Sequence, residues 1–143
     1  MTIFTRKVTA DALNALSANT LAGHLGIEVT DIGEDYIEAR MPVDHRTHQP
    51  LGLLHGGASV ALAETLGSMA ATCCIDMDTH FVVGLEINAN HLRSVKEGFV
   101  VGRASPIHIG KKTQVWEIKI VDQAGGALVC VSRITIAVLE KRK

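Results

Sequence analysis

The sequence carries almost no net charge and contains few cysteines and aromatic residues. Fourteen Lys and Arg nearly balance fifteen Asp and Glu among the 143 residues. Because no field of one sign dominates, we expect neither nucleic acid nor an anionic membrane as a partner, and any anion site has to be local. Cys73, Cys74 and Cys130 lack the paired spacing of a secreted disulfide framework, so we expect reduced core thiols in a cytoplasmic protein.

Targeting and membrane signals are also lacking. The N-terminus has no continuous apolar segment followed by a small-residue cleavage site, as a secretory signal would have. Only Ala58 to Ile75 approaches membrane-spanning length, but Glu64 lies near its middle, neither end carries Lys or Arg, and Asp76 follows at once. We therefore expect a buried helix of a soluble protein rather than a membrane span.

The order of helical and strand patterns predicts one α+β domain over residues 1–143. Thr9 is a candidate N-cap for a short helix near residues 10–18, and strand patterns follow at 26–32 and 35–43, separated by a turn. The apolar helix begins near Gly57. Four further strand patterns cover 81–92, 99–109, 113–122 and 127–139. Their separators, SVKEG, GKK and QAGG, contain the Gly and polar residues typical of hairpin turns.

This order calls for an antiparallel sheet with one long helix against it. The helix is apolar almost all round, and a single curved sheet covers only one of its sides. Its other side and the free edge of the sheet therefore need a partner surface, and oligomerisation is the simplest way to provide one.

Glu64 is the one charged residue within this apolar helix. Burying an unpaired carboxylate costs several kcal/mol, so a functional role is expected. Counting from Gly57, Glu64 and Ser68 fall on one stripe of small residues that would let a thin ligand approach closely. The preceding His55 and Gly56 place free backbone N–H groups at the helix N-terminus, which suit the oxyanion of an acyl-transfer intermediate. A nearby carboxylate could activate water or attack directly.

The helix start and the Glu64 carboxylate are too far apart to act together within one chain. Glu64 is seven residues from Gly57, which along a helix is roughly 10 Å, too far for both helix start and carboxylate to meet at one carbonyl. If two such helices lie antiparallel across a two-fold axis, Glu64 of one approaches Gly56 of the other. Dimerisation and catalysis would then share one surface.

Other interpretations of these residues are open from position alone. Glu64 could be a structural acid hydrogen-bonded to Ser68, and His55 could be a structural loop histidine. His45, His48 and His55 invite a metal site, but no Cys or supporting pattern accompanies them, so we expect none. Neither Ser59 nor Ser68 stands in a G-x-S-x-G elbow, which disfavours a serine hydrolase.

The segments GLLHGGASVALAETLGS, MPVDHRTHQP, VGLEINANH and QVWEI resemble the hotdog-fold acyl-CoA thioesterases over essentially the whole chain. The likeness is greatest to the bacterial branch with 1,4-dihydroxy-2-naphthoyl-CoA thioesterase of menaquinone biosynthesis and the proofreading thioesterase of enterobactin synthesis. The resemblance implies a long central helix wrapped by a curved sheet, and a homodimer or homotetramer with shared sites. It implies Glu64 as nucleophile or general base and Ser68 beside it, with Gln49, His55 and Gly56 of the opposite subunit holding the thioester.

Coenzyme A binding is inferred from the same resemblance. Basic residues on strand ends would meet the CoA phosphates, which here suggests His91, Arg93, Ser94 and the turn Gly110, Lys111 and Lys112. We therefore expect hydrolysis of an acyl-CoA, aromatic in its acyl group, without metal or other cofactor. The alternatives are hydrolysis of acyl groups on a carrier protein, a hotdog dehydratase, whose His-Phe-Pro loop is missing here, and a non-catalytic acyl-CoA-binding protein.

Overall fold

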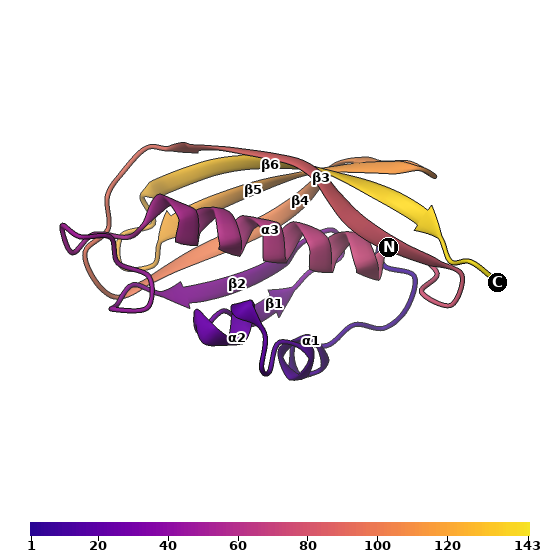
Figure 1. The fold of residues 1–143 in the computed structure, drawn as a ribbon, viewed down its shortest axis with the longest axis horizontal. Coiled ribbons are helices and arrows are strands. Elements are labelled where there is room, and N and C mark those ends of the chain that lie inside the picture. The colour runs from indigo at the N-terminus through magenta and orange to yellow at the C-terminus, as the bar shows by residue number, and fades with distance from the viewer.

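One long helix lies across the concave face of one antiparallel sheet in the computed structural model, which describes residues 1–143 (Figure 1). The helices are α1 (Ala10–Leu16), α2 (Leu21–His24) and α3 (Gly56–Cys73). The strands are β1 (Glu28–Ile32), β2 (Ile37–Pro42), β3 (His80–His91), β4 (Phe99–Ile109), β5 (Thr113–Asp122) and β6 (Leu128–Glu140). Their order across the sheet is β1-β2-β4-β5-β6-β3, with antiparallel neighbours throughout. The predicted α+β hotdog fold is confirmed.

Helix α3 is held by its buried face. Leu62 and Leu66 are fully buried in the core between the helix and the sheet, where full burial of such a side chain contributes roughly 1.5–3 kcal/mol. Gly67 allows close approach to the sheet, because a β-carbon added there would lie 2.6 Å from Cγ2 of Ile134 on β6. The opposite side of the helix, with Glu64, is only partly covered. This side is the one that the apolar pattern predicted to need a partner.

The connection between β3 and β4 differs from its prediction. We expected SVKEG to form a hairpin turn, but β3 pairs with β6 at one edge of the sheet, while β4 lies between β2 and β5. The connecting segment instead crosses the start of α3, where Val95 is buried and its carbonyl accepts a hydrogen bond from the N–H of Leu54 at 2.8 Å. Gly and polar residues are shared by hairpin turns and crossing loops, so turn composition alone does not distinguish the two.

Strand β3 is left as a free edge that carries exposed apolar side chains. Phe81, Val83 and Leu85 are 42 %, 39 % and 62 % exposed. Unpaired backbone groups beside apolar side chains are a surface on which another chain can pair. The predicted oligomer would cover this edge.

The two N-terminal helices lie beyond the β1 edge of the sheet (Figure 1). Thr9 caps α1 as predicted, accepting a hydrogen bond from the N–H of Ala12. Asn14 on α1 binds both backbone groups of Val29 on β1, at 2.8 and 3.1 Å, which fixes the helix against the sheet edge. The four-residue α2 was not predicted, because one turn is too short to show a periodic pattern. None of the helices has the length and apolar character needed to span a bilayer.

Candidate active site

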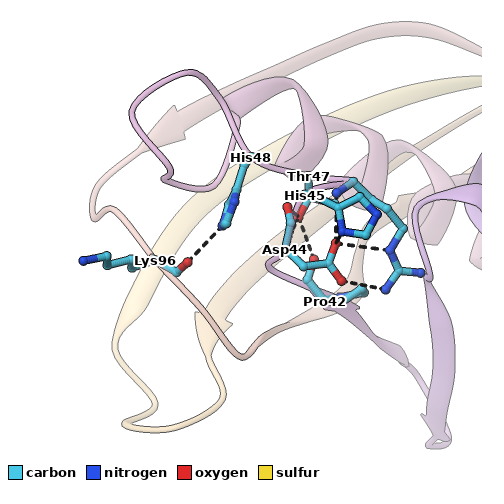
Figure 2. A network of polar contacts seen from close by, with 7 residues as sticks. Pro42, Asp44, His45, Thr47, His48 and Lys96 are labelled. Atoms are coloured by element: carbon cyan, nitrogen blue, oxygen red, sulfur yellow. Dashed lines mark hydrogen bonds and ion pairs between the residues drawn. The ribbon is translucent and has the colours of Figure 1, made fainter.

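The loop before α3 is fixed by a network of polar contacts (Figure 2). The buried Thr47 donates its hydroxyl to the carbonyl of Pro42 at 2.7 Å, and its own carbonyl accepts from the N–H of His55 at 2.8 Å. Asp44 accepts hydrogen bonds from the guanidinium of Arg46 at 2.7 and 3.1 Å, and this partner lowers the pKa of Asp44 to about 2. The network connects the end of β2 to His55, the N-cap of the long helix.

Gln49 stands in a tight loop that leaves one of its polar groups free. Its backbone N–H donates to the carbonyl of Leu53 and its carbonyl accepts from Gly52, whose positive φ of 74° suits glycine. Its side-chain oxygen accepts from the N–H of Leu51. The side-chain NH₂ group has no partner within the chain and can donate to a ligand.

The N-terminus of α3 leaves a single backbone donor unused. The N–H of Gly57 donates to Nδ1 of His55 at 2.8 Å, and those of Ala58 and Ser59 donate to the carbonyl of His55. The N–H of Gly56 has no partner in the chain. Because Nδ1 of His55 accepts a hydrogen bond, the proton of the neutral ring is on Nε2, where it can be donated. Gly56 and His55 therefore both offer donors at the positive end of the helix dipole.

A cavity of about 350 Å³ opens at the Gly56 and Gln49 donors, whereas His55, which was also predicted for the site, is not among its lining residues. It brings together five of the predicted site residues: Gln49, Gly56, His91, Arg93 and Ser94. The ring of His91 covers Gly56 so closely that a β-carbon there would lie 2.8 Å from Nε2 of the imidazole, so a larger residue at this position would have to displace the ring. The other lining residues, which were not predicted, are Leu53, Leu54, Ser59, Leu92 and Val129.

Glu64 does not reach this cavity from its own chain. Its carboxylate lies against Gly84 on β3, and its Oε2 atom is buried without a hydrogen-bond partner. No hydrogen bond joins Glu64 to Ser68, so the interpretation of a structural acid satisfied by Ser68 lacks the bond it requires. Ser68 instead lines a second cavity, of about 440 Å³, between α3 and the two N-terminal helices. Within one chain the predicted acid and the predicted oxyanion donor remain separate.

The predicted CoA-binding residues fall into two groups. His91, Arg93 and Ser94 lie near the start of α3, whereas Gly110, Lys111 and Lys112 line a cavity with Cys74 and Ile75, just beyond its end. The 18-residue helix is about 27 Å long, so one chain does not bring the two groups together.

The remaining nucleophiles and histidines have structural surroundings. Burial raises the pKa of the Cys73 thiol to about 11 and that of Cys74 to about 12, which leaves both protonated at neutral pH. Nε2 of His48 is hydrogen-bonded to the carbonyl of Lys96 at 2.9 Å, and Nδ1 of the exposed His45 lies 4.0 Å from Oδ1 of Asp44 (Figure 2). No group of three or more His, Cys, Asp or Glu side chains is arranged to hold a metal ion.

Gly84, which lies against the Glu64 carboxylate, is a further residue that the sequence did not point to. The sequence placed it only within a strand pattern. An isolated glycine within a strand is a signal for a bulge or a close approach, and that signal could have found it.

Comparison with known proteins identifies the class to which this fold and site belong. The Thioesterase superfamily pattern matches residues 51–129, which include the helix α3 and most of the cavity lining. The chain therefore belongs to the thioesterase superfamily and is a thioester hydrolase.

Two named relatives are similar over nearly the full chain. The chain is 53 % identical to 1,4-dihydroxy-2-naphthoyl-CoA hydrolase of Escherichia coli, covering 96 % of this chain and 99 % of that one. It is 55 % identical to proofreading thioesterase EntH of Cronobacter turicensis, covering 96 % and 98 %. A crystal structure of a thioesterase from Haemophilus influenzae is 52 % identical and superposes with a TM-score of 0.93, covering 96 % of this chain and 95 % of that one.

Proposed function

We propose that this protein hydrolyses an aromatic acyl-CoA thioester to the free acid and coenzyme A, in a site formed by two subunits. The observation that carries the proposal is the Glu64 carboxylate, which has a buried oxygen without a partner in its own chain. A two-fold axis that sets two α3 helices antiparallel brings Glu64 of the partner subunit toward the free N–H of Gly56. The carboxylate and the oxyanion donor then face one carbonyl.

The chemistry follows from the donors at the helix start. The thioester oxygen accepts hydrogen bonds from the N–H of Gly56 and the free NH₂ group of Gln49, with His55 beside them, so negative charge on that oxygen is stabilised as it forms. Glu64 of the partner subunit takes a proton from water, and the resulting hydroxide adds to the carbonyl carbon. The C–S bond then breaks, and Glu64 returns its proton to the leaving sulfur, so that CoA departs as the thiol.

Direct attack by the carboxylate is the other route open to the same residues. It forms a mixed anhydride and releases CoA, and water then hydrolyses the anhydride. Both routes consume one water, yield the same products and need no group other than the protein's own residues.

The cavity between α3 and the N-terminal helices supports an apolar acyl group. Its volume of about 440 Å³ is within the range of small-molecule sites, and its walls include Leu13, Leu16, Leu21 and Met69. The hydroxyls of Thr65 and Thr72 in this wall are bonded to backbone carbonyls of α3, which leaves Ser68 as the free hydroxyl near Glu64. An aromatic ring would fill this space with little polar surface left unpaired.

The same two-fold arrangement supports a single coenzyme A site. Antiparallel helices bring the end of one α3, near which Lys111 and Lys112 lie, toward the start of the other, near which Arg93 lies. The two basic groups that one chain separates would then surround one set of phosphates. A carrier-protein thioester is the second candidate substrate, since it shares the pantetheine arm and the chain is about as similar to a proofreading thioesterase as to a CoA hydrolase.

A panel of substrates tests the proposal. The wild-type enzyme is assayed with aryl, short-chain and long-chain acyl-CoA and with an aryl-loaded carrier protein, and we expect the highest kcat/KM for aryl-CoA. Higher values for long saturated chains would refute the aromatic preference, and higher values for the carrier-protein ester would favour the second candidate.

The role of Glu64 is tested with Glu64→Gln, which keeps the shape of the side chain and removes its basicity. We expect kcat to fall by at least about 100-fold, with an unfolding midpoint equal to or above that of the wild type because a buried charge is lost. Glu34→Gln is the matched control, because Glu34 is highly exposed and pairs only with the N-terminal ammonium. A Glu64→Gln enzyme with near-normal turnover would remove Glu64 from the mechanism.

A further inference from the structure

The Glu64 carboxylate occupies the space that a side chain at position 84 would fill. A β-carbon added to Gly84 would lie 2.9 Å from Oε1 and 3.4 Å from Oε2 of Glu64. Real β-carbons essentially never approach another atom to less than 3.0 Å. The carboxylate can therefore lie where it does only because residue 84 has no side chain.

The backbone of β3 is irregular at this point. Its pairing with β6 is regular up to Gly84 opposite Ile136, then shifts so that Glu86 faces Thr135, leaving Leu85 as an extra residue. Such a bulge bends a strand locally and changes the direction in which neighbouring side chains point. Gly84 and the bulge thus shape the surface of the strand next to Glu64.

No polar group of the chain fixes the carboxylate from the other side. Its Oε2 atom is buried without a hydrogen-bond partner, and neither carboxylate oxygen accepts a hydrogen bond from Ser68. The close approach of the carboxyl group to the bare backbone at Gly84 is therefore made without a hydrogen bond to hold the group in place.

We propose that Gly84 is a positioning residue for Glu64, holding the carboxylate at the depth from which it acts by leaving room for it against β3. This inference rests on the proposed catalytic role of Glu64. It assigns to Gly84 no contact with substrate. It makes the glycine a requirement of catalysis and not of folding.

Other glycines of the chain are required for packing, in contrast to Gly84. β-Carbons at Gly67 and Gly102 would meet core side chains, Ile134 at 2.6 Å and Leu66 at 2.8 Å, so packing requires those glycines. At Gly84 the neighbour is the end of a flexible side chain on the partly covered side of α3. Alanine at position 84 is accommodated by moving that side chain, and alanine also costs less conformational entropy than glycine in a strand.

The direct test is Gly84→Ala. We expect kcat to fall by roughly 10- to 100-fold, the effect of displacing a catalytic group by about 1 Å, while KM changes little. The unfolding midpoint and the oligomeric state by sedimentation should match the wild type. Gly125→Ala is the matched control, because its added β-carbon would meet nothing within 4 Å and Gly125 lies in the turn between β5 and β6. It should retain wild-type kcat.

A double-mutant cycle with Glu64→Asp separates positioning from a general structural role. Aspartate is one methylene shorter and withdraws the carboxylate from the space that the methyl group introduced at position 84 would occupy. In the Glu64→Asp background, measured by single-turnover kinetics, Gly84→Ala should therefore lower the rate by less than about threefold, a strongly non-additive result.

Each outcome decides the inference. Wild-type kcat for Gly84→Ala, an equal loss of rate in both backgrounds, or a loss that follows a lowered unfolding midpoint would each overturn it. If Glu64→Gln itself retained full activity, the proposed catalytic role would fail first. A loss with Glu64→Gln but none with Gly84→Ala would overturn the positioning role alone.

Discussion

Asp44, in the loop before the site, contributes to the stability of the fold through its negative charge. Arg46 binds both carboxylate oxygens and lowers the pKa of Asp44 from 3.8 to about 2. A carboxyl group with a lowered folded-state pKa stabilises the protein above the pKa of its unfolded state and loses that contribution as the pH falls through the folded pKa. The contribution is therefore complete above about pH 5 and disappears toward pH 2.

We expect Asp44→Asn to lower the free energy of unfolding at pH 7 by up to about 1 kcal/mol, since the pair is partly exposed. The difference between variant and wild type should vanish near pH 2, where the wild-type carboxylate becomes protonated. Thermal unfolding of both proteins at pH 7, 4 and 2 measures this. A difference that stayed constant over these pH values would show that the charge of Asp44 is not the cause.

Individual site residues were predictable where they stand out from the residues next to them in the sequence. Glu64 is a charge within an apolar helix, and Gly56 precedes a helix start, so both are visible along the chain. The bonds that leave the Gly56 N–H free are not visible, because they depend on the His55 ring turning back to Gly57. Gly84 was missed because its neighbour Glu64 is twenty residues away in sequence and comes close only through the α3–β3 packing.

At the scale of elements, alternation of apolar and polar residues predicted the strands well. The structural bounds of β4 and β5 are those of the sequence patterns, 99–109 and 113–122. The pairing of β3 was not predictable in the same way. Side-chain alternation reports which face of a strand is buried, but not which strand lies beside it.

Gly67 tests the packing between α3 and the sheet. Alanine is favoured over glycine within a helix by about 1 kcal/mol, but here its methyl group would lie 2.6 Å from Cγ2 of Ile134 in the fully packed core. Overpacking costs typically 1–3 kcal/mol, so we expect Gly67→Ala to lower the free energy of unfolding in urea by about 1–2 kcal/mol.

The matched test adds Ile134→Leu, which removes the Cγ2 methyl from the contact. The two substitutions together should cost less than the sum of their separate effects, because the leucine leaves room for the new methyl group. An additive result, or a Gly67→Ala protein more stable than the wild type, would mean that the helix can move away from β6 at little cost.

At the scale of the whole molecule, the sequence predicted that Glu64 and the donors at the start of α3 are separated within one chain, and the structure has the same separation. The helix rise put Glu64 beyond reach of the start of its own helix, and the structure has the acid against β3 and the donors at a different cavity. The division of the basic residues between the two ends of α3 was not foreseen. It depends on where the β4–β5 turn lies in the folded sheet.

The shared site makes a prediction that only an assembly of two chains can satisfy. Homodimers of Glu64→Gln and of Gln49→Ala should each be severely impaired, because the symmetry repeats one lesion in both sites. In a mixed dimer, one site collects both lesions and the other collects neither. Unfolding and refolding an equal mixture should therefore restore roughly a quarter of wild-type activity, since half of the dimers are mixed and each has one intact site.

A complete site within each chain would give a different result. If each chain held a complete site, every site in the refolded mixture would still carry one lesion, and activity would stay at the level of the parents. Mixing the two folded variants without unfolding is the control, because chains that have not exchanged gain no intact site. Recovery only after refolding would connect the free N–H of Gly56 on one chain with the unpartnered carboxylate of Glu64 on another.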